Sequence, residues 1–293
     1  MAAGEMKLTD PQFIQRLESL YLLARKVLGG SLQADRKSVK KGAGVTFADY
    51  SEYYYGADFR AIDWRVFARF ETLVVKLFEL EEDATIYLLM DCSQSMASKF
   101  PYAKQLTAAL AYIALSSLDR VAIYGLGDGL TPVLEPCRGR AKALAMLRGL
   151  EDAPLLEGDT RFNLAARQFR ARHARRGLVV AISDFLFPEG FEEGLKFLGY
   201  HGHEVYALQV QDEGDTRCEL RGDVDLECVE TDARLRVTVS PREARLYEEA
   251  VAEWNESLRR CCVRLGVGLA ATTPEAPFER VVQDILRRGG LVA

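Results

Sequence analysis

Histidine is scarce in this chain, and its cysteines follow no recognisable pattern. The 293 residues include only His173, His201 and His203, so catalysis or metal binding by imidazole has little to draw on. The six cysteines form no CxxC pair and have no matching histidine cluster. Neither a zinc site nor a disulfide framework is therefore expected, and the cysteines should be reduced thiols.

The chain also has no excess of positive charge and no long hydrophobic run. Its net charge is −5, whereas a protein whose main partner is nucleic acid or an anionic membrane needs a basic face. No apolar stretch approaches the roughly 20 residues that cross a bilayer, and residues 1–7 lack the apolar core of a signal peptide. With 48% hydrophobic and 28% charged residues, the sequence predicts a cytoplasmic globular protein that binds no nucleic acid and is not inserted in a membrane.

Two apolar runs each end at a carboxylate. The run Ile86–Met90 leads into Asp91-Cys92-Ser93-Gln94-Ser95, and the run Leu178–Ser183 ends at Asp184. Apolar runs without polar alternation are typical of strands covered on both faces, as in a parallel sheet flanked by helices. Because ligands of open α/β sheets gather beyond the carboxyl ends of the strands, both carboxylates are expected at one edge of the sheet.

Strand and helix patterns alternate from residue 84 onward. This alternation favours an α/β fold with a mostly parallel, Rossmann-like sheet and helices on both faces. We expect an N-terminal helix in residues 1–35, a small β-rich module in residues 36–83 and the α/β domain in residues 84–293. Within that domain, alternating apolar residues at about 212–240 predict a β-hairpin insertion.

The loop before the next helix adds a hydroxyl at Thr160. Together, the three segments offer five oxygen-bearing side chains: Asp91, Ser93, Ser95, Thr160 and Asp184. An all-oxygen set suits Mg²⁺ or Mn²⁺, and not a metal that prefers thiolate or imidazole. Two carboxylates balance a divalent ion and the hydroxyls add no charge, so the ion would keep affinity for an outside carboxylate. The sequence therefore predicts a metal site that grips an acidic partner residue and is not an enzyme's active site.

The pattern Asp-x-Ser-x-Ser after a buried strand resembles the metal-ion-dependent adhesion site of von Willebrand factor A domains. Upstream, Tyr53–Trp64 with its Arg-x-Ile-Asp-Trp run, then Ala68-Arg69 and Glu79-Leu80-Glu81, is similar to the family catalogued as domain of unknown function 58. The resemblance implies a von Willebrand factor A-like fold. It also implies a MoxR-type AAA+ ATPase as partner, because members of the family are commonly linked to such ATPases.

The chain departs from the pattern of that family at two positions. Ala57 stands where a second acidic residue is common, and Asp159 stands where a second glycine is usual before the threonine. Asp159 adds negative charge beside the predicted ion, which weakens the case that the ion must recruit an acidic partner.

Two other interpretations of the five oxygens stay open. In the first, Asp, Ser and Thr only cap helices and close turns, as they commonly do, and the protein is a metal-free scaffold. In the second, the chain is a Mg²⁺-dependent phosphohydrolase with Asp91 as nucleophile. Such enzymes place an acid two residues further on to handle the leaving group, and Ser93 occupies that position here.

The segment Arg60–Trp64 has two interpretations as well. Arg60, Asp63 and Trp64 either form a docking surface or belong to an aromatic-packed turn in which an Arg–Asp pair fixes the module to the sheet. We expect the packed turn, because Ile62 and Trp64 would bury well there.

Overall fold

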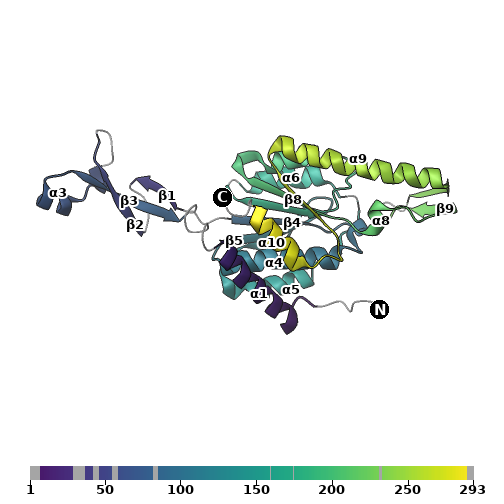
Figure 1. Cartoon of the computed structure of the whole chain (residues 1–293), viewed down its shortest axis with the longest axis horizontal. Coiled ribbons are helices and arrows are strands. Elements are labelled where there is room, and N and C mark those ends of the chain that lie inside the picture. Colours follow the sequence, from purple (N-terminus) through teal and green to yellow (C-terminus); the bar gives the residue numbers. More distant parts are fainter. Residues whose placement is uncertain are drawn as a thin grey trace. The chain divides into compact units, whose positions relative to one another are not determined.

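The computed structural model describes residues 7–28, 37–41, 46–54, 59–81, 85–158, 160–173, 175–230 and 233–288. Ala57 and Asp159, the two departures from the family pattern, lie outside these ranges. The chain divides into two compact units (Figure 1). Unit 1 contains residues 1–24 and 84–291, and unit 2 is formed mainly by residues 25–83. In the sequence, unit 2 is therefore an insertion in unit 1.

The main sheet of unit 1 has the spatial strand order β11-β8-β7-β4-β5-β6. The strands are β4 (Thr85–Asp91), β5 (Arg120–Leu126), β6 (Leu130–Arg138), β7 (Leu178–Ser183), β8 (Glu204–Val210) and β11 (Gly268–Thr272). Neighbouring strands are parallel, except that β6 runs antiparallel to β5 at the edge. The chain builds outward from β4 in both directions, which is the doubly wound arrangement. The predicted mostly parallel α/β sheet is confirmed.

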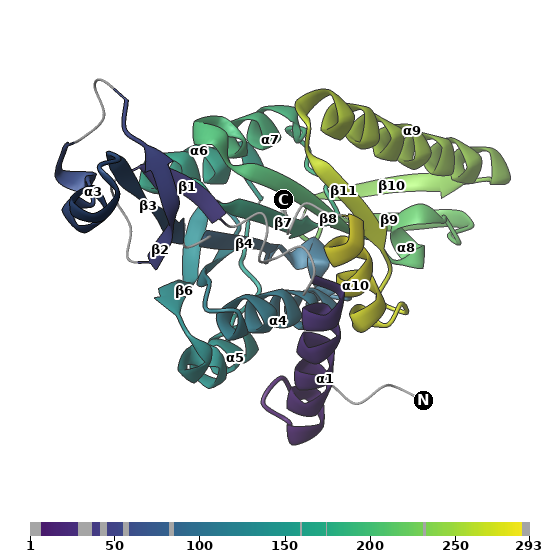
Figure 2. The same cartoon turned by 60° about the vertical axis from the view of Figure 1, so that its left-hand side comes forward.

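Helices cover both faces of this sheet, which explains why β4 and β7 are buried along their whole length (Figure 2). One face packs against α4 (Phe100–Ser116), with α5 (Ala143–Glu151) and α10 (Phe278–Arg288) beside it. The other face packs against α6 (Phe162–Arg172), α7 (Glu192–Leu198) and α9 (Pro241–Leu265). In the described part of the chain, no helix combines the length and the apolar character that crossing a membrane requires.

The N-terminal helix α1 (Pro11–Leu28) joins the core of unit 1 through its buried apolar face. The Phe13 ring lies 5.4 Å from the Phe278 ring of α10, and Arg16 forms an ion pair of 2.6 Å with Glu279. Leu17 and Leu20 are also buried. The beginning of the chain is therefore part of the α/β core.

A β-hairpin stands apart from the main sheet. After the short helix α8 (Glu213–Thr216), strands β9 (Gly222–Glu227) and β10 (Arg234–Val239) pair antiparallel and form a sheet of their own. Most of their side chains are exposed. The hairpin insertion predicted at about 212–240 is present.

Unit 2 is built on an antiparallel sheet with the order β1-β3-β2. Its elements are β1 (Lys37–Lys41), β2 (Thr46–Glu52), η1 (Phe59–Ala61), α3 (Trp64–Phe70) and β3 (Val74–Glu81). The β-rich character predicted for this part of the chain is therefore found.

Asp63 organises the turn that follows η1. Its buried carboxylate accepts hydrogen bonds from the backbone N–H of Arg65 and of Val66, and so caps α3. It also accepts a 3.0 Å hydrogen bond from the Tyr50 hydroxyl. Ile62 is buried as expected, but the expected burial of Trp64 is wrong, because this side chain is 60% exposed. The cap starts the helix at Trp64, and none of the residues of α3 is buried.

Candidate functional site

The candidate site lies where β4 and β7 end. These two neighbouring strands form the point at which the order of the sheet reverses, and this is where ligands bind in open α/β sheets. Asp91 is the last residue of β4, Ser183 is the last residue of β7, and Asp184 follows directly. All three side chains are buried.

Hydrogen bonds from three segments hold the Asp91 carboxylate. The Ser183 hydroxyl donates to Oδ2 at 2.6 Å, which ties β7 to β4. The backbone N–H of Ser93 and the Thr160 hydroxyl donate to Oδ1, at 3.0 and 3.5 Å. These donors fix the orientation of Asp91 before any ligand binds.

The two serines of the Asp-x-Ser-x-Ser pattern lie next to each other. The hydroxyl oxygens of Ser93 and Ser95 are 3.0 Å apart. The short helix η2 (Gln94–Met96) begins directly after Ser93 and brings the serines together. Ser93 is buried, whereas Ser95 is exposed, so the pair leads from the buried carboxylate to the surface.

Thr160 reaches the site from the loop before α6. Its side chain is buried. The following residue fixes the loop, because the Arg161 backbone N–H donates to the Gly127 carbonyl in the turn after β5 at 2.8 Å. The structure therefore brings the Thr160 hydroxyl within 3.5 Å of the Asp91 carboxylate.

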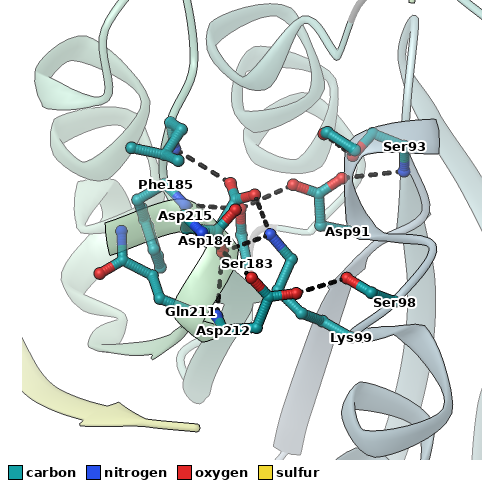
Figure 3. A network of polar contacts seen from close by, with 12 residues as sticks. Asp91, Ser93, Ser98, Lys99, Ser183, Asp184, Phe185, Gln211, Asp212 and Asp215 are labelled. Carbon is teal, nitrogen blue, oxygen red and sulfur yellow. Dashed lines mark hydrogen bonds and ion pairs between the residues drawn. The ribbon is translucent and has the colours of Figure 1, made fainter. Parts of the chain in front are cut away.

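Asp184 pairs with a buried lysine that the sequence did not point to. The Lys99 Nζ atom lies 2.8 Å from Asp184 Oδ2 and 2.7 Å from Asp215 Oδ2 (Figure 3). The side chain of Lys99 is 1% exposed. The other oxygen of Asp184 accepts a hydrogen bond from the Leu186 backbone N–H at 3.0 Å. Both oxygens of Asp184 are thus engaged within the protein.

The backbone after Asp184 is held in a strained conformation. Phe185 has a φ of 60°, which is uncommon for a bulky residue. Its N–H donates to the Ser183 hydroxyl oxygen at 2.9 Å, and its carbonyl accepts a 2.9 Å hydrogen bond from the Trp254 indole of α9. Strain that the surroundings enforce is typical of functional sites.

The electrostatics of the site reflect crowded carboxylates. Burial, reinforced by the charge of Asp184, raises the pKa of Asp91 to about 6. Burial also raises the pKa of Asp215, although Lys99 opposes this shift. Burial alone would lower the pKa of Lys99, but Asp184 and Asp215 more than offset it, and the pKa is raised. The lysine therefore stays positively charged, while Asp91 is costly to ionise.

The side chains at the site offer oxygen atoms, which small, hard cations prefer as ligands. Ligand oxygens at about 2.0–2.1 Å from an octahedral Mg²⁺ lie about 3 Å from their neighbours. The Ser93 and Ser95 hydroxyl oxygens are 3.0 Å apart, and the Thr160 oxygen is 3.5 Å from Asp91 Oδ1. Among the described residues, no three His, Cys, Asp or Glu side chains form a cluster that could hold a metal. A cation here would therefore depend on hydroxyl ligands as well as on carboxylates.

Sequence reasoning placed the strand ends but missed supporting residues. The sequence pattern places Ser183 only within its strand and gives no signal for Lys99 or Asp215. Lys99 and Asp215 are 116 positions apart in the sequence, and a local sequence pattern does not predict such a contact.

Comparisons with known proteins add a family and related sequences. A family model described as "Protein of unknown function DUF58" matches residues 49–257. The chain is 29% identical over 288 residues to Rv1480 of Mycobacterium tuberculosis, described as an uncharacterized protein, and the match covers 95% of this chain and 89% of the relative.

Solved structures with a similar fold were also found. The protein BatB from Bacteroides thetaiotaomicron, described as a conserved hypothetical protein, matches with a TM-score of 0.42 and 12% identity over 70% of this chain and 100% of that chain. A von Willebrand factor type A structure from Catenulispora acidiphila matches with a TM-score of 0.40 and 11% identity over 73% of this chain and 44% of that chain.

Proposed function

Because this chain belongs to the DUF58 family and has a von Willebrand factor A-like α/β fold, we propose that it is a non-enzymatic protein-interaction module with a cation site at the ends of β4 and β7. The cation would be Mg²⁺ or Mn²⁺, and it would bind a carboxylate of a partner protein. This proposal extends the sequence prediction, and the geometry of the site supports it.

The observation that carries the proposal is the uncompensated negative charge buried at the site. The ammonium group of Lys99 contacts two carboxylates, those of Asp184 and Asp215. The buried carboxylate of Asp91 is held by hydrogen bonds from Ser183, Ser93 and Thr160, and the charge of Asp184 repels it. Buried charges that are not paired are costly, and the protein relieves the cost by taking up protons. The raised pKa of Asp91 has this effect, because a higher pKa favours the protonated, uncharged carboxyl group. A divalent cation would remove the imbalance.

The side chains would divide the work of binding the ion. Asp91, Ser93, Ser95 and Thr160 would provide ligand oxygens. Asp184 would act mainly through its charge, because its carboxylate is already paired with the ammonium group of Lys99. When bound, the cation would offer an electrophilic position to an outside carboxylate. Ser95 is exposed, so this position would lie on the side of the site that faces the surface.

We propose a MoxR-like AAA+ ATPase as the partner, with this protein as its adaptor or substrate-recognition subunit in the cytoplasm. Membership of the family supports this choice. The experiment is a binding measurement with a purified MoxR-like AAA+ ATPase, by surface plasmon resonance, in Mg²⁺ and in EDTA. We expect EDTA and Asp91→Ala each to abolish binding.

A matched control separates loss of the ion from a general loss of negative charge. Asp128 lies in the turn between β5 and β6, and its side chain is 75% exposed. Asp128→Ala should leave binding unchanged. If the complex forms equally well in EDTA and with Asp91→Ala, the metal-bridged interaction is wrong.

The phosphohydrolase interpretation can be tested on the same protein. The residue two positions after Asp91 is Ser93, whose hydroxyl contacts Ser95, so the site has no acid there. We expect no hydrolysis of an aryl phosphate in Mg²⁺. Hydrolysis that Asp91→Ala removes would replace our proposal with an enzymatic function. Failure of the wild-type protein to bind Mg²⁺ or Mn²⁺ in a calorimetric titration would favour the metal-free scaffold.

A further inference from the structure

A carboxylate from the β9–β10 hairpin contacts the serine loop of the site. Glu230 lies in the connection between β9 and β10, and its Oε1 atom accepts a 2.9 Å hydrogen bond from the Ser95 backbone N–H. Ser95 is one of the proposed ligands, and its hydroxyl oxygen lies 3.0 Å from that of Ser93. An acidic side chain of the chain itself therefore stands next to the position proposed for the cation.

The second oxygen of this carboxylate has no hydrogen-bond partner among the residues that the structure describes. Among the described residues, Glu230 Oε2 is buried and accepts no hydrogen bond. A buried acceptor without a partner is costly, and an unplaced ion or water is a common reason for one. A cation bound by Ser93 and Ser95 would supply the missing partner, since Oε2 belongs to the same carboxylate that contacts Ser95.

We propose that Glu230 is an internal acidic ligand of the cation. It would occupy the place of a partner's carboxylate, so the hairpin would have to withdraw before the partner could bind. This inference rests on the proposed function, because it requires the cation site. It adds self-inhibition, in which the module competes with its own partner for one coordination position.

The hairpin is built in a way that allows it to leave. β9 and β10 pair with each other and with no other described strand, and two-stranded hairpins are marginally stable alone. The cross-strand pairs Arg234–Glu227 and Arg236–Asp225 are exposed, and exposed ion pairs contribute little. Release of Glu230 would therefore not disturb the main sheet.

The test uses Mn²⁺ alone as the probe on the full chain, without any partner. Glu230→Gln keeps the shape of the side chain and removes its charge. Glu227→Gln is the matched control, because Glu227 belongs to the same hairpin and its side chain is 52% exposed. Calorimetry gives the Mn²⁺ dissociation constant, and water proton relaxation gives the number of water molecules on the bound ion. Acetate, added last, serves as a minimal external carboxylate.

For Glu230→Gln we expect Mn²⁺ affinity to fall at least about tenfold, the lower end of what loss of a supporting group costs a metal site. We also expect one more water on the bound ion, and displacement of water at a lower acetate concentration than in the wild type. Glu227→Gln should match the wild type in all three measurements.

Two outcomes would overturn the inference, and they are distinguishable. If Mn²⁺ binds in an Asp91-dependent way but Glu230→Gln behaves like Glu227→Gln, Glu230 is not a ligand and the proposed cation site stands. If the wild type binds no Mn²⁺, both the cation site and the role of Glu230 are wrong.

Discussion

The ammonium group of Lys99 lies 2.8 Å from the carboxylate of Asp184 in the interior of unit 1. Lys99 directly precedes α4, and Asp184 directly follows β7, so the pair joins a helix start to a strand end. A second carboxylate, from Asp215, lies 2.7 Å from the same ammonium. The lysine is a fixed positive charge beside the proposed cation and limits how much negative charge the site presents.

Lys99→Met should destabilise the protein strongly. The substitution leaves the buried Asp184 and the half-buried Asp215 without their positive partner, and removing one side of a buried pair costs about 3–5 kcal/mol. Urea denaturation in EDTA measures the loss in free energy of unfolding. Asp215→Asn is the control, because it keeps the contact of Lys99 with Asp184 and should cost clearly less. If both variants lost the same free energy of unfolding, Lys99 would not stabilise Asp184 and Asp215 together as described.

Asp91→Asn should separate stability from metal binding. The substitution removes a buried charge that Asp184 repels, so the metal-free variant should melt at a higher temperature than the metal-free wild type. An excess of Mg²⁺ of 100 times its dissociation constant should stabilise the wild type by about 2.7 kcal/mol and leave the variant unchanged. Thermal melts with EDTA and with Mg²⁺ check both expectations. A Mg²⁺-dependent shift that persists in the variant would remove Asp91 from the ligand set.

His173 should make the protein less stable in mild acid. Burial, with the nearby charges of His203 and Arg172, lowers the pKa of His173. The folded protein then binds fewer protons than the unfolded chain, whose histidine titrates at about 6.5. The contribution of His173 to the free energy of unfolding should therefore be fully present above about pH 6.5. It should decrease as the pH falls from about 6.5 toward the lowered pKa of His173.

His173→Phe checks this dependence. The ring of His173 lies 4.8 Å from that of Tyr87 and 4.9 Å from that of Phe169, so an aromatic replacement keeps the ring contacts. Urea midpoints measured between about pH 5 and 8 should show a shallower slope for the variant. Parallel curves for the variant and the wild type would assign the acid sensitivity to other groups.

Gly177→Ala should strain the junction between β4 and β7. A Cβ atom on Gly177 would lie 2.2 Å from the Thr85 backbone carbonyl oxygen, and backbone cannot yield as a flexible side chain does. We expect a loss of about 1–3 kcal/mol or more, as for other overpacked positions. Gly149→Ala, within α5, has its nearest contact at 3.4 Å and should gain up to about 1 kcal/mol from helix propensity. Chemical denaturation gives the free energy of unfolding of both variants. If Gly149→Ala proved less stable than Gly177→Ala, the packing argument would be wrong.

The strands and the approximate site could be predicted because their signals are local. An apolar run that ends at a carboxylate marks both the strand and its edge, so Asp91 and Asp184 were placed from sequence alone. The helix α9 spans Pro241–Leu265, and local signals mark both of its ends. Its start carries a capping box at Ser240 and Glu243, and its end carries Gly266, each of which is a short-range signal.

The missed residues depend on contacts between distant segments. Lysine is almost never fully buried unless it is paired, and the partner of Lys99 at Asp215 is far away in the sequence. Glu230 and Ser95 are 135 positions apart in the sequence, and they meet only because the fold brings the hairpin to the serine loop. The expectation that Trp64 is buried is wrong for a different reason. Asp63 caps α3 and so fixes Trp64 as its first residue, where the side chain is exposed.

The contact of Phe13 with Phe278 has a consequence for how the protein is made. α1 leaves the ribosome long before α10, and the aromatic rings and the Arg16–Glu279 pair cannot meet until synthesis has passed residue 279. Contacts between such distant segments form slowly because a long loop must close first. During translation, Phe13 therefore remains without its contact to α10, and a chain truncated before residue 278 would leave this part of α1 uncovered.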